Sequence, residues 1–284
     1  MLDPDKLRLV VDDRRVLLQR SNVIFWLYAV QGYATKPYVA VLRGPSGRNV
    51  LEDSPADHVH HHGIWWGHGD VNGVDFYLEV APDAGLIVQT SVDVIDDAPR
   101  WGFASDLEWR APSGEVLIGE RRSLLLHARD ETHYTLDCDS TYTMRVDAAF
   151  GDTKESVMPG LRVAEALTPV CGGAIRNSEG GVGEADCMGK PAAWLDYSAP
   201  RTAMYGLAEV TDGITTMSHP SNDSHPPVFF ARDYGPSSPW QGNHFTGPSS
   251  HAAGSALRAR HRFLVHDGSV DLAAAYDTYV KEMR

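Results

Sequence analysis

The chain has 284 residues, of which 43% are hydrophobic and 22% are charged, and this balance excludes wholesale disorder. Its 25 basic and 38 acidic side chains give a formal net charge of −13. That charge argues against nucleic acids and anionic membrane surfaces as partners, because both are bound mainly through Lys and Arg.

Apolar and polar residues alternate with a period of two along most of the chain, a pattern typical of half-buried strands. In the segment 257–265, Leu257, Phe263 and Val265 fall on one side, and Arg258 and Arg260 fall on the other. The sequence predicts strands, in chain order, at 7–11, 16–19, 23–28, 38–42, 87–95, 103–109, 116–127, 132–146, 161–165, 193–197, 203–211, 228–231 and 257–265.

One segment, 270–283, carries an apolar stripe with helical spacing, and Ser269 is suited to cap its first turn. Many strands with a single terminal helix predict an all-β fold, a large antiparallel β-sandwich. No linker or repeat divides the sequence, so we expect one domain over 1–284.

Two long segments, 44–73 and 218–250, are predicted to be irregular. Together they hold eight of the 13 histidines and three of the 7 tryptophans. Because long loops in compact domains are usually functional or disordered, we expect the functional site in these two segments.

The sequence also indicates a compartment. It lacks the ~20 consecutive apolar residues of a membrane helix, and its first residues do not follow the pattern of a secretory signal. Its cysteines, Cys138, Cys171 and Cys187, are sparse and form no CxxC motif, which is typical of a reducing compartment. We therefore expect a cytoplasmic protein.

The most informative stretch is Asp57-His-Val-His-His-His-Gly-Ile-Trp-Trp-Gly-His-Gly-Asp-Val-Asn72. In an extended backbone, His58, His60 and His62 would project to one side and His61 to the other. Imidazole can donate or accept a proton near neutral pH, and it is also a common metal ligand. Acid/base chemistry, a divalent metal site and simple hydrogen bonding to turn carbonyls are all consistent with this pattern.

The two tryptophans of this stretch also have two interpretations. Trp65 and Trp66 could be ordinary core residues. Alternatively, one of them could stack on the apolar face of a sugar, because an aromatic ring beside hydrogen-bonding groups suits that surface.

Further polar residues extend the candidate site. Glu165 shares the strand parity of Leu161, so it is predicted to point inward, where a carboxylate is costly unless it is paired or functional. Lys154 beside Glu155 could be a solvated ion pair or a substrate contact. His219 and Arg232 fall in the second long segment. We expect one cavity lined by His58, His60, His61, His68 and His219.

The histidine stretch resembles a bacterial family often labelled PmoA-like or "methane oxygenase", with the approximate pattern D-H-P-H-H-R-G-I-W-x-x-H-G-D-V-N-G-x-D-F. Val59 stands in place of the usual Pro, and His62 in place of an Arg, which removes a permanent cation. The similarity continues through Gly44-Pro-Ser-Gly47, Gly151-Asp-Thr-Lys-Glu155, Gly160-Leu-Arg-Val-Ala164, Asn177-Ser-Glu-Gly180, Gly189-Lys190, Asp196-Tyr197, His219-Pro220, Arg232-Asp-Tyr-Gly235 and Val265-His-Asp-Gly268.

This resemblance implies a β-sandwich similar to galactose mutarotase and a place in bacterial sugar catabolism. The oxygenase label conflicts with the sequence. The membrane subunit whose name it borrows needs spanning helices, and this sequence has no apolar segment long enough to form one.

The sequence and the resemblance together favour a carbohydrate-active enzyme that moves a proton on a sugar or keto-sugar, by epimerisation, elimination or hydration. Two alternatives stay open: a metal-dependent lyase or hydrolase that uses the same histidines, and a non-catalytic sugar-binding or regulatory subunit. No cofactor is firmly predicted. The candidate catalytic residues are His61, His68, His219 and Glu165, and the candidate substrate contacts are His58, His60, Trp65, Trp66, Asp70, Asn72, Lys154 and Arg232.

Overall fold

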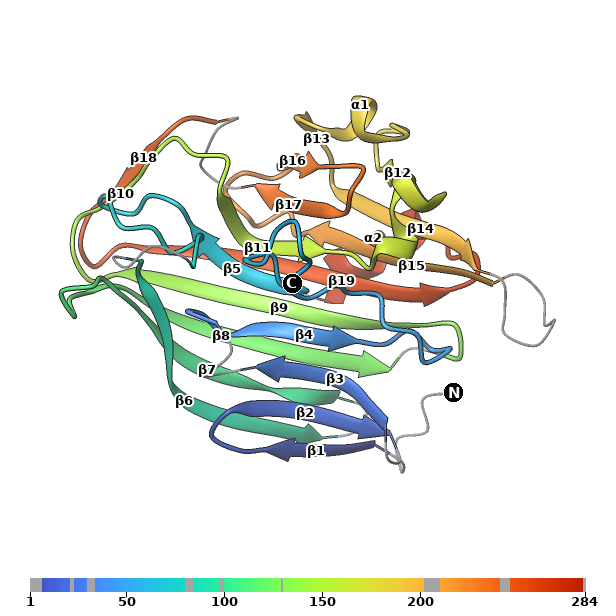
Figure 1. The fold of residues 1–284 in the computed structure, drawn as a ribbon, viewed down its shortest axis with the longest axis horizontal. Coiled ribbons are helices and arrows are strands. Elements are labelled where there is room, and N and C mark those ends of the chain that lie inside the picture. Colours follow the sequence, from blue (N-terminus) through green and yellow to red (C-terminus); the bar gives the residue numbers. More distant parts are fainter. Residues whose placement is uncertain are drawn as a thin grey trace.

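The computed structural model describes residues 7–20, 23–29, 34–79, 84–97, 100–128, 130–201, 210–240 and 246–282. Within these residues the strands form a nine-stranded sheet, an eight-stranded sheet and a two-stranded pair (Figure 1). The predicted all-β sandwich is therefore confirmed.

The nine-stranded sheet contains, in spatial order, β1 (Leu7–Val11), β2 (Arg15–Arg20), β3 (Val23–Ala29), β4 (Tyr38–Leu42), β5 (Ile64–His68), β11 (Ser156–Arg162), β17 (Pro236–Trp240), β16 (Val228–Ala231) and β13 (Lys190–Pro191). The eight-stranded sheet contains β12 (Ala174–Asn177), β14 (Trp194–Arg201), β15 (Val210–Ser218), β19 (Ala256–Asp267), β9 (His133–Met144), β8 (Val116–Ala128), β7 (Arg100–Arg110) and β6 (Leu86–Asp97). The separate pair joins β10 (Ala148–Phe150) to β18 (Ser249–His251).

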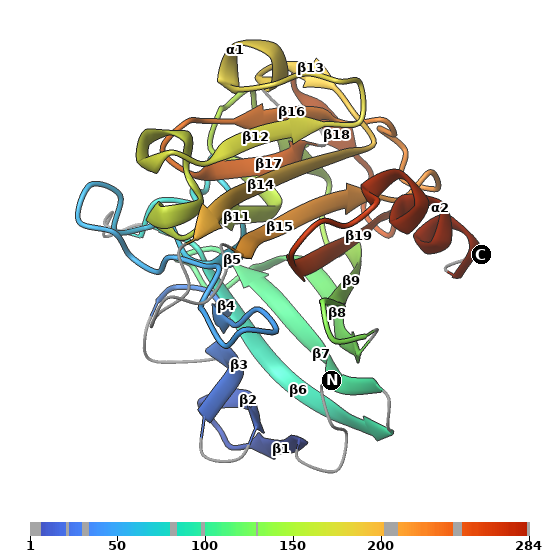
Figure 2. The ribbon, with the colours of Figure 1, turned by 90° about the vertical axis from the view of Figure 1, so that its right-hand side faces the viewer.

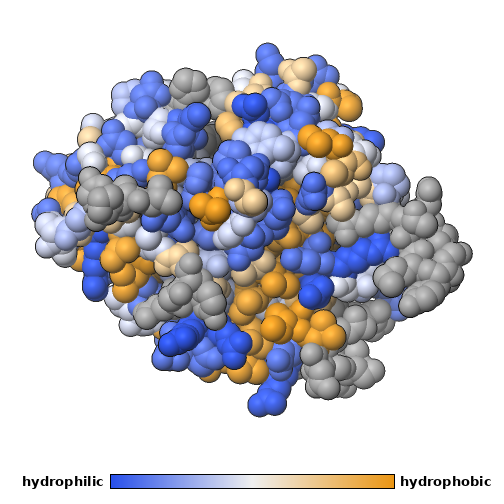
Figure 3. All heavy atoms as spheres, in the orientation of Figure 1, coloured by the Kyte–Doolittle hydropathy of each residue, from blue (hydrophilic) through white to orange (hydrophobic). Residues whose placement is uncertain are grey.

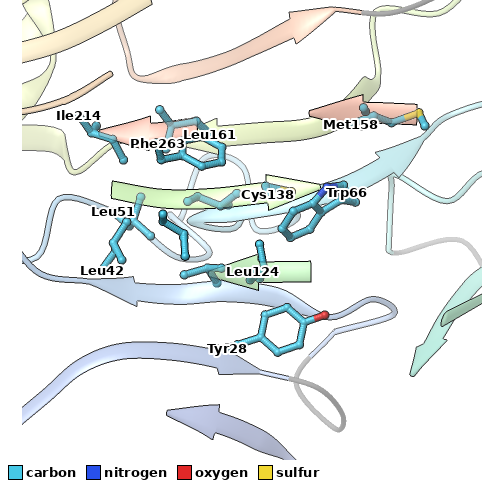
Figure 4. Packing of buried hydrophobic residues seen from close by; sticks show 14 of the residues in the cluster. Tyr28, Leu42, Leu51, Trp66, Leu124, Cys138, Met158, Leu161, Ile214 and Phe263 are labelled. Atoms are coloured by element: carbon cyan, nitrogen blue, oxygen red, sulfur yellow. The ribbon is translucent and has the colours of Figure 1, made fainter. Parts of the chain in front are cut away.

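The inner faces of the two large sheets share one apolar core. Trp66 and Leu161 of the nine-stranded sheet belong to the same buried cluster as Leu124 and Phe263 of the eight-stranded sheet (Figure 4). Because side chains alternate across a strand, each inward position contributes to this core, and full burial of a large apolar side chain stabilises the fold by ~1.5–3 kcal/mol.

The outer face of the nine-stranded sheet carries a second, smaller apolar cluster. Tyr38, Trp65 and Tyr77 belong to it, together with partly buried Leu27 and Val41. On the face seen in Figure 3, apolar side chains gather over β2 to β4, and more polar surface lies above them. The histidine-rich loop, residues 52–63, packs on this outer cluster.

The outer face of the eight-stranded sheet is partly covered by α2 (Leu272–Glu282), which lies beside β15 and β19 in Figure 2. Buried Tyr279 of α2 packs there against Met217 and Leu264. The predicted C-terminal helix is thus present, and a short helix α1 (Glu184–Cys187) precedes β13. No described helix combines the length and the apolar character needed to cross a membrane.

The structure corrects the prediction of two irregular segments, because β5 lies inside 44–73, and β17 lies inside 218–250. Every residue of β5 and β11 is buried. Both faces of these strands are covered, so their sequences lack the alternation that reveals a half-buried strand. The predicted strand 203–211 lies mostly outside the described residues.

Candidate functional site

The histidine-rich loop is held against the end of β11 by backbone hydrogen bonds. Glu52 N donates to Arg162 O at 3.1 Å, and Ser54 N donates to His61 O at 2.8 Å. Between these contacts the chain turns, since His58 N bonds to Pro55 O and His61 N bonds to His58 O. The backbone of 55–61 is therefore not extended, so the projection of His58 and His60 to one side and His61 to the other does not apply, and the turns bring these three residues together.

These three histidines, with Tyr77, Arg162 and Tyr234, form what we call the histidine cluster. His61 stacks on His58 with ring centroids 4.6 Å apart and meets His60 edge-on at 4.8 Å. The other side of His58 faces Tyr234 at 5.3 Å. The cluster lies on the outer face of the nine-stranded sheet, because His61 also stacks on Trp65 at 5.3 Å.

Both ring nitrogens of His61 are engaged. Arg162 Nη1 donates to His61 Nδ1 at 3.2 Å, and His61 Nε2 lies 3.0 Å from the Tyr77 hydroxyl. A guanidinium can only donate, so Nδ1 must be the unprotonated nitrogen and Nε2 carries the proton. Burial, together with the nearby charges of His60, His58 and Arg162, lowers the pKa of His61 to about 2. His61 is therefore a neutral imidazole that donates to Tyr77.

His60 is the least constrained ring of the cluster. It touches His58, His61 and Tyr77, and its ring nitrogens have no hydrogen-bond partner among the described residues. Burial lowers its pKa below 6.5, and the neighbouring charges of His58 and Lys36 add to this. By contrast, His58 Nδ1 is engaged by Asp57 at 2.9 Å. His60 is thus a neutral, half-buried imidazole that is free to exchange a proton.

His62 is separated from the histidine cluster and lies in a buried ion network. Its ring stacks on Tyr38 at 3.9 Å, Nδ1 lies 2.7 Å from Asp53, and Nε2 lies 3.2 Å from Glu79. Glu79 is also paired with buried Lys36 at 2.6 Å. Burial opposes protonation, but the two carboxylates outweigh it and raise the pKa of His62. This network fixes the end of the loop to the sheet.

The two tryptophans are not available to stack on a sugar. Trp65 is 1% exposed under His61 and Tyr77, and Trp66 is 0% exposed in the sandwich core. Arg122 lies over the Trp66 ring at 3.7 Å. The interpretation of these residues as core is therefore the correct one, since strand alternation places one under the loop and the other between the sheets.

Three further residues of the motif lie outside the histidine cluster. His68 is buried at the far end of β5, where it meets Phe150 edge-on and accepts a hydrogen bond from Asp70 N. The Asp70 carboxylate accepts from Gly73 N, and Asn72 bonds the backbone of Asp147 and Ala149. These contacts build the turn after β5.

The structure also places Glu165 and Lys154 away from any converging group. β11 ends at Arg162, and Glu165 is exposed in the short 3-10 helix Glu165–Leu167. The prediction that its carboxylate points inward is wrong, because the strand parity does not continue that far. Lys154 is exposed and lies 3.7 Å from Glu155, as expected for a solvated pair.

The prediction that His219 joins the cavity of the other histidines is also wrong. His219 follows β15 in the other sheet and meets Tyr279 of α2 edge-on at 5.3 Å. Arg232 is closer to the histidine cluster, since its guanidinium lies 5.6 Å from the Tyr234 ring and 3.0 Å from Glu184. The two predicted irregular segments meet at this site through the contact of Tyr234 with His58.

Tyr77, Arg162 and Tyr234 were not among the predicted site residues. Arg162 is 4% exposed, and its Nε also lies 3.3 Å from Glu52. A permanent cation inside the buried strand β11 was the signal in the sequence that could have identified it.

No group of three or more His, Cys, Asp or Glu side chains among the described residues is arranged as a metal site. In the histidine cluster, Arg162 and Tyr77 already engage both nitrogens of His61. Both ring nitrogens of this central imidazole are therefore already used in hydrogen bonds.

Several solved structures are similar to this chain at low sequence identity. One is an α-galactosidase from Lactobacillus brevis (7% identity, TM-score 0.42), of which 39% is covered by 93% of this chain. A second is a galactose mutarotase related enzyme from Lactobacillus acidophilus (9% identity, TM-score 0.36); the match covers 92% of this chain and 97% of that chain. A third is a GalM/aldose epimerase homologue from C. elegans (8% identity, TM-score 0.37); the match covers 93% of this chain and 99% of that chain. These likenesses are too distant to carry over an activity, and the chain spans well under half of the α-galactosidase.

A search of curated proteins found no match. A family model, in contrast, matches residues 15–279, which is most of the chain. The model has no oxygenase name and no assigned reaction, and its description is "Family of unknown function (DUF6807)". The chain belongs to this family.

Proposed function

We propose that the chain is an enzyme that moves a proton on a sugar or keto-sugar at the histidine cluster. The observation that carries this proposal is the packing of the His60 imidazole on the Tyr77 ring, with centroids 5.4 Å apart, next to the His61 imidazole that is bonded to the Tyr77 hydroxyl. A positioned base next to a positioned hydrogen-bond donor is what the removal of a proton beside a carbonyl requires.

In the proposed reaction, His60 accepts the proton from the carbon next to the substrate carbonyl. The electron pair of the broken C–H bond moves into the forming C=C bond, and the carbonyl π electrons move to oxygen, which becomes an enolate. Release of this proton from His60 to solvent, followed by delivery of a proton from water to the opposite face of the carbon, would epimerise the sugar. Loss of a hydroxyl from the next carbon, which takes up the proton held by His60 and leaves as water, would complete an elimination.

Tyr77 is the proposed donor to the enolate oxygen. Its hydroxyl accepts from His61 Nε2, so its own hydrogen is free to point toward a ligand. Burial raises the pKa of Tyr77 well above its ordinary value, so the phenol stays protonated and acts as a donor. Arg162 fixes this arrangement through His61 and is therefore a positioning residue.

The charges around the cluster favour an uncharged substrate. Arg162 is shared by His61 Nδ1, Glu52 Oε2 at 3.3 Å and Asp57 Oδ1 at 3.5 Å. Its positive charge is thus already compensated by two carboxylates and has little attraction left for a phosphate or a sugar acid. Tyr234 is the partly exposed aromatic ring of the cluster and is the proposed contact for an apolar sugar face.

We place this activity in the cytoplasm. Support comes from the described cysteines, because Cys138, Cys171 and Cys187 form no disulfide. Titration of three thiols in denatured, unreduced protein is the expected result.

The test is turnover of a panel of neutral keto-sugars in D2O, followed by NMR. Wild type should incorporate deuterium beside the carbonyl, and His60→Gln should be slower by ~10²–10⁴-fold. His133→Gln is the matched control, because half-buried His133 begins β9 in the other sheet and, among the described residues, its ring bonds to its neighbours Asp130 and Thr132. Loss of turnover on chelation, restored by a divalent ion, would favour the metal-dependent alternative. Sugar binding without turnover would favour the non-catalytic one.

A further inference from the structure

A polar cavity lies on the outer face of the eight-stranded sheet, the side of the sandwich opposite to the histidine cluster. It has a volume of about 380 Å³ and is lined by residues of β7, β8, β9, β19 and the end of α2. A cavity of this size is large enough to hold a monosaccharide.

The hollow has a local cause in the sequence. Strand pairing places Gly102 opposite Leu125 and Ala104 opposite Ser123. Gly102 has no side chain, and those of Ala104 and Ser123 are small, so the outer surface of the sheet has a depression at this point. Taller side chains of neighbouring strands, and Glu282 at the end of α2, surround it.

The wall contains a buried network of ion pairs. Arg262 donates to both carboxylate oxygens of Asp137, at 2.5 and 2.8 Å, and its Nη1 lies 2.8 Å from Glu282. His127 Nε2 lies 3.2 Å from the same Asp137 carboxylate. Although burial opposes ionisation of Asp137, the hydrogen bonds from Arg262 and the nearby His127 keep its pKa below the ordinary value.

Stability alone is a weak explanation for this network. The side chains of Arg262 and Asp137 are only 3% and 6% exposed, and a buried ion pair often contributes no more than well-packed apolar residues would. His127 lies at the cavity with Nε2 within ion-pair distance of Asp137, and neither of its ring nitrogens makes a hydrogen bond to other described residues. The Ser123 hydroxyl is likewise without a partner among them.

Charge balance narrows the class of ligand. Each carboxylate of the wall is compensated: Asp137 and Glu282 by Arg262, and Asp139 by Arg258 at 2.6 Å. An anion would meet these carboxylates, and a cation would meet the guanidinium groups of Arg262 and Arg100. Hydroxyl groups both donate and accept hydrogen bonds, so they suit a wall that contains both guanidinium donors and carboxylate acceptors.

We propose that this cavity is a second ligand site, which binds a neutral polyhydroxylated molecule of monosaccharide size. His127, Ser123 and Asp137 supply the hydrogen-bonding groups, and α2 positions Glu282 at the rim. The site is separate from the histidine cluster and does not depend on the reaction proposed there.

The experiment is a titration of ¹⁵N-labelled protein with D-galactose, D-glucose and myo-inositol, followed by amide chemical shifts. Glucose 6-phosphate, glucuronate and glucosamine serve as charged counterparts. At least one neutral probe should shift the amides of 123–127 and 137–139. Ser123→Trp should weaken that binding by at least ~10-fold, because the indole fills the hollow from a partly exposed position. Ser250→Trp, at an exposed position of β18, is the control.

His127→Gln should also weaken binding while the Asp137–Arg262 pair is kept, which separates ligand contact from folding. Shifts confined to the amides of 58–61 and 77 would overturn the second site without affecting the proposal for the histidine cluster. Shifts of the cavity amides by charged probes alone would overturn the neutral ligand class. The absence of any shift at 123–139 with all six probes would overturn the proposal.

Discussion

Arg162 Nη1 lies 3.2 Å from His61 Nδ1, and this contact determines which nitrogen of the imidazole carries the proton. A guanidinium cannot accept a hydrogen bond, so His61 Nδ1 must be the acceptor. The imidazole proton is therefore on Nε2, which faces the Tyr77 hydroxyl. One buried cation on β11 thereby orients the hydrogen of a tyrosine on a different segment. This relationship connects the fold of the nine-stranded sheet to the chemistry of the histidine cluster.

Replacement of Arg162 by Lys should disturb the His61 tautomer. A single ammonium cannot serve His61, Glu52 and Asp57 at the same time, so His61 should populate both tautomers. Side-chain ¹⁵N shifts of wild type at neutral pH should show an unprotonated Nδ1 and a protonated Nε2. A doubly protonated His61 in wild type would contradict this assignment.

Replacement of Tyr77 by Phe should lower turnover by ~10²–10³-fold, the usual effect of losing one donor to an oxyanion. Its cost to the free energy of unfolding should be ~1 kcal/mol, because one buried hydrogen bond is lost. Tyr134→Phe is the matched control. Tyr134 lies on β9 of the other sheet, and the variant removes a hydroxyl that donates to Arg43 O at 2.7 Å. Equal activity of Tyr77→Phe and Tyr134→Phe would remove Tyr77 from the mechanism.

His62 should make stability depend on pH. Its pKa is raised in the folded state, so its contribution is fully present below the unfolded value of about 6.5 and is lost as pH rises through the folded value. The difference in the free energy of unfolding between wild type and His62→Gln should therefore shrink as the pH rises above about 6.5. Urea unfolding at several pH values measures it, and a difference that grows with pH would be inconsistent with an imidazolium between Asp53 and Glu79.

Much of the fold could be predicted from the sequence, because half-buried strands such as β9 and β19 have clear alternation. β5 and β11 could not, since both their faces are covered and every residue is buried. The histidine motif did indicate the site, and His58, His60 and His61 do converge. Their partners were harder to predict: Arg162 could be noticed as a cation among the apolar residues of β11, but only the folded chain brings it to His61, and Tyr77 lies in an irregular segment after β5.

The same reasoning explains the incorrect assignments. Glu165 was placed by strand parity, but β11 ends three residues earlier and leaves the carboxylate in solvent. His219 was grouped with the motif by composition, and it belongs to the other sheet.

Glu165→Gln and Lys154→Ala should therefore leave turnover unchanged. Both side chains are exposed, and an exposed pair such as Lys154 with Glu155 contributes only ~0.2–1 kcal/mol. Turnover and urea unfolding of the two variants check this expectation. A loss of turnover in Glu165→Gln with normal stability would restore that residue as a candidate base.

The most direct test of the account is the pH dependence of kcat/KM for wild type and His60→Gln on a substrate that turns over. Burial lowers the pKa of His60, so wild-type kcat/KM should be constant near neutral pH and fall only on the acid side, below pH 6.5. His60→Gln should lose ~10²–10⁴-fold in kcat/KM and should lack this acid limb. An unchanged rate and an unchanged acid limb in His60→Gln would contradict the assignment of His60 as the base.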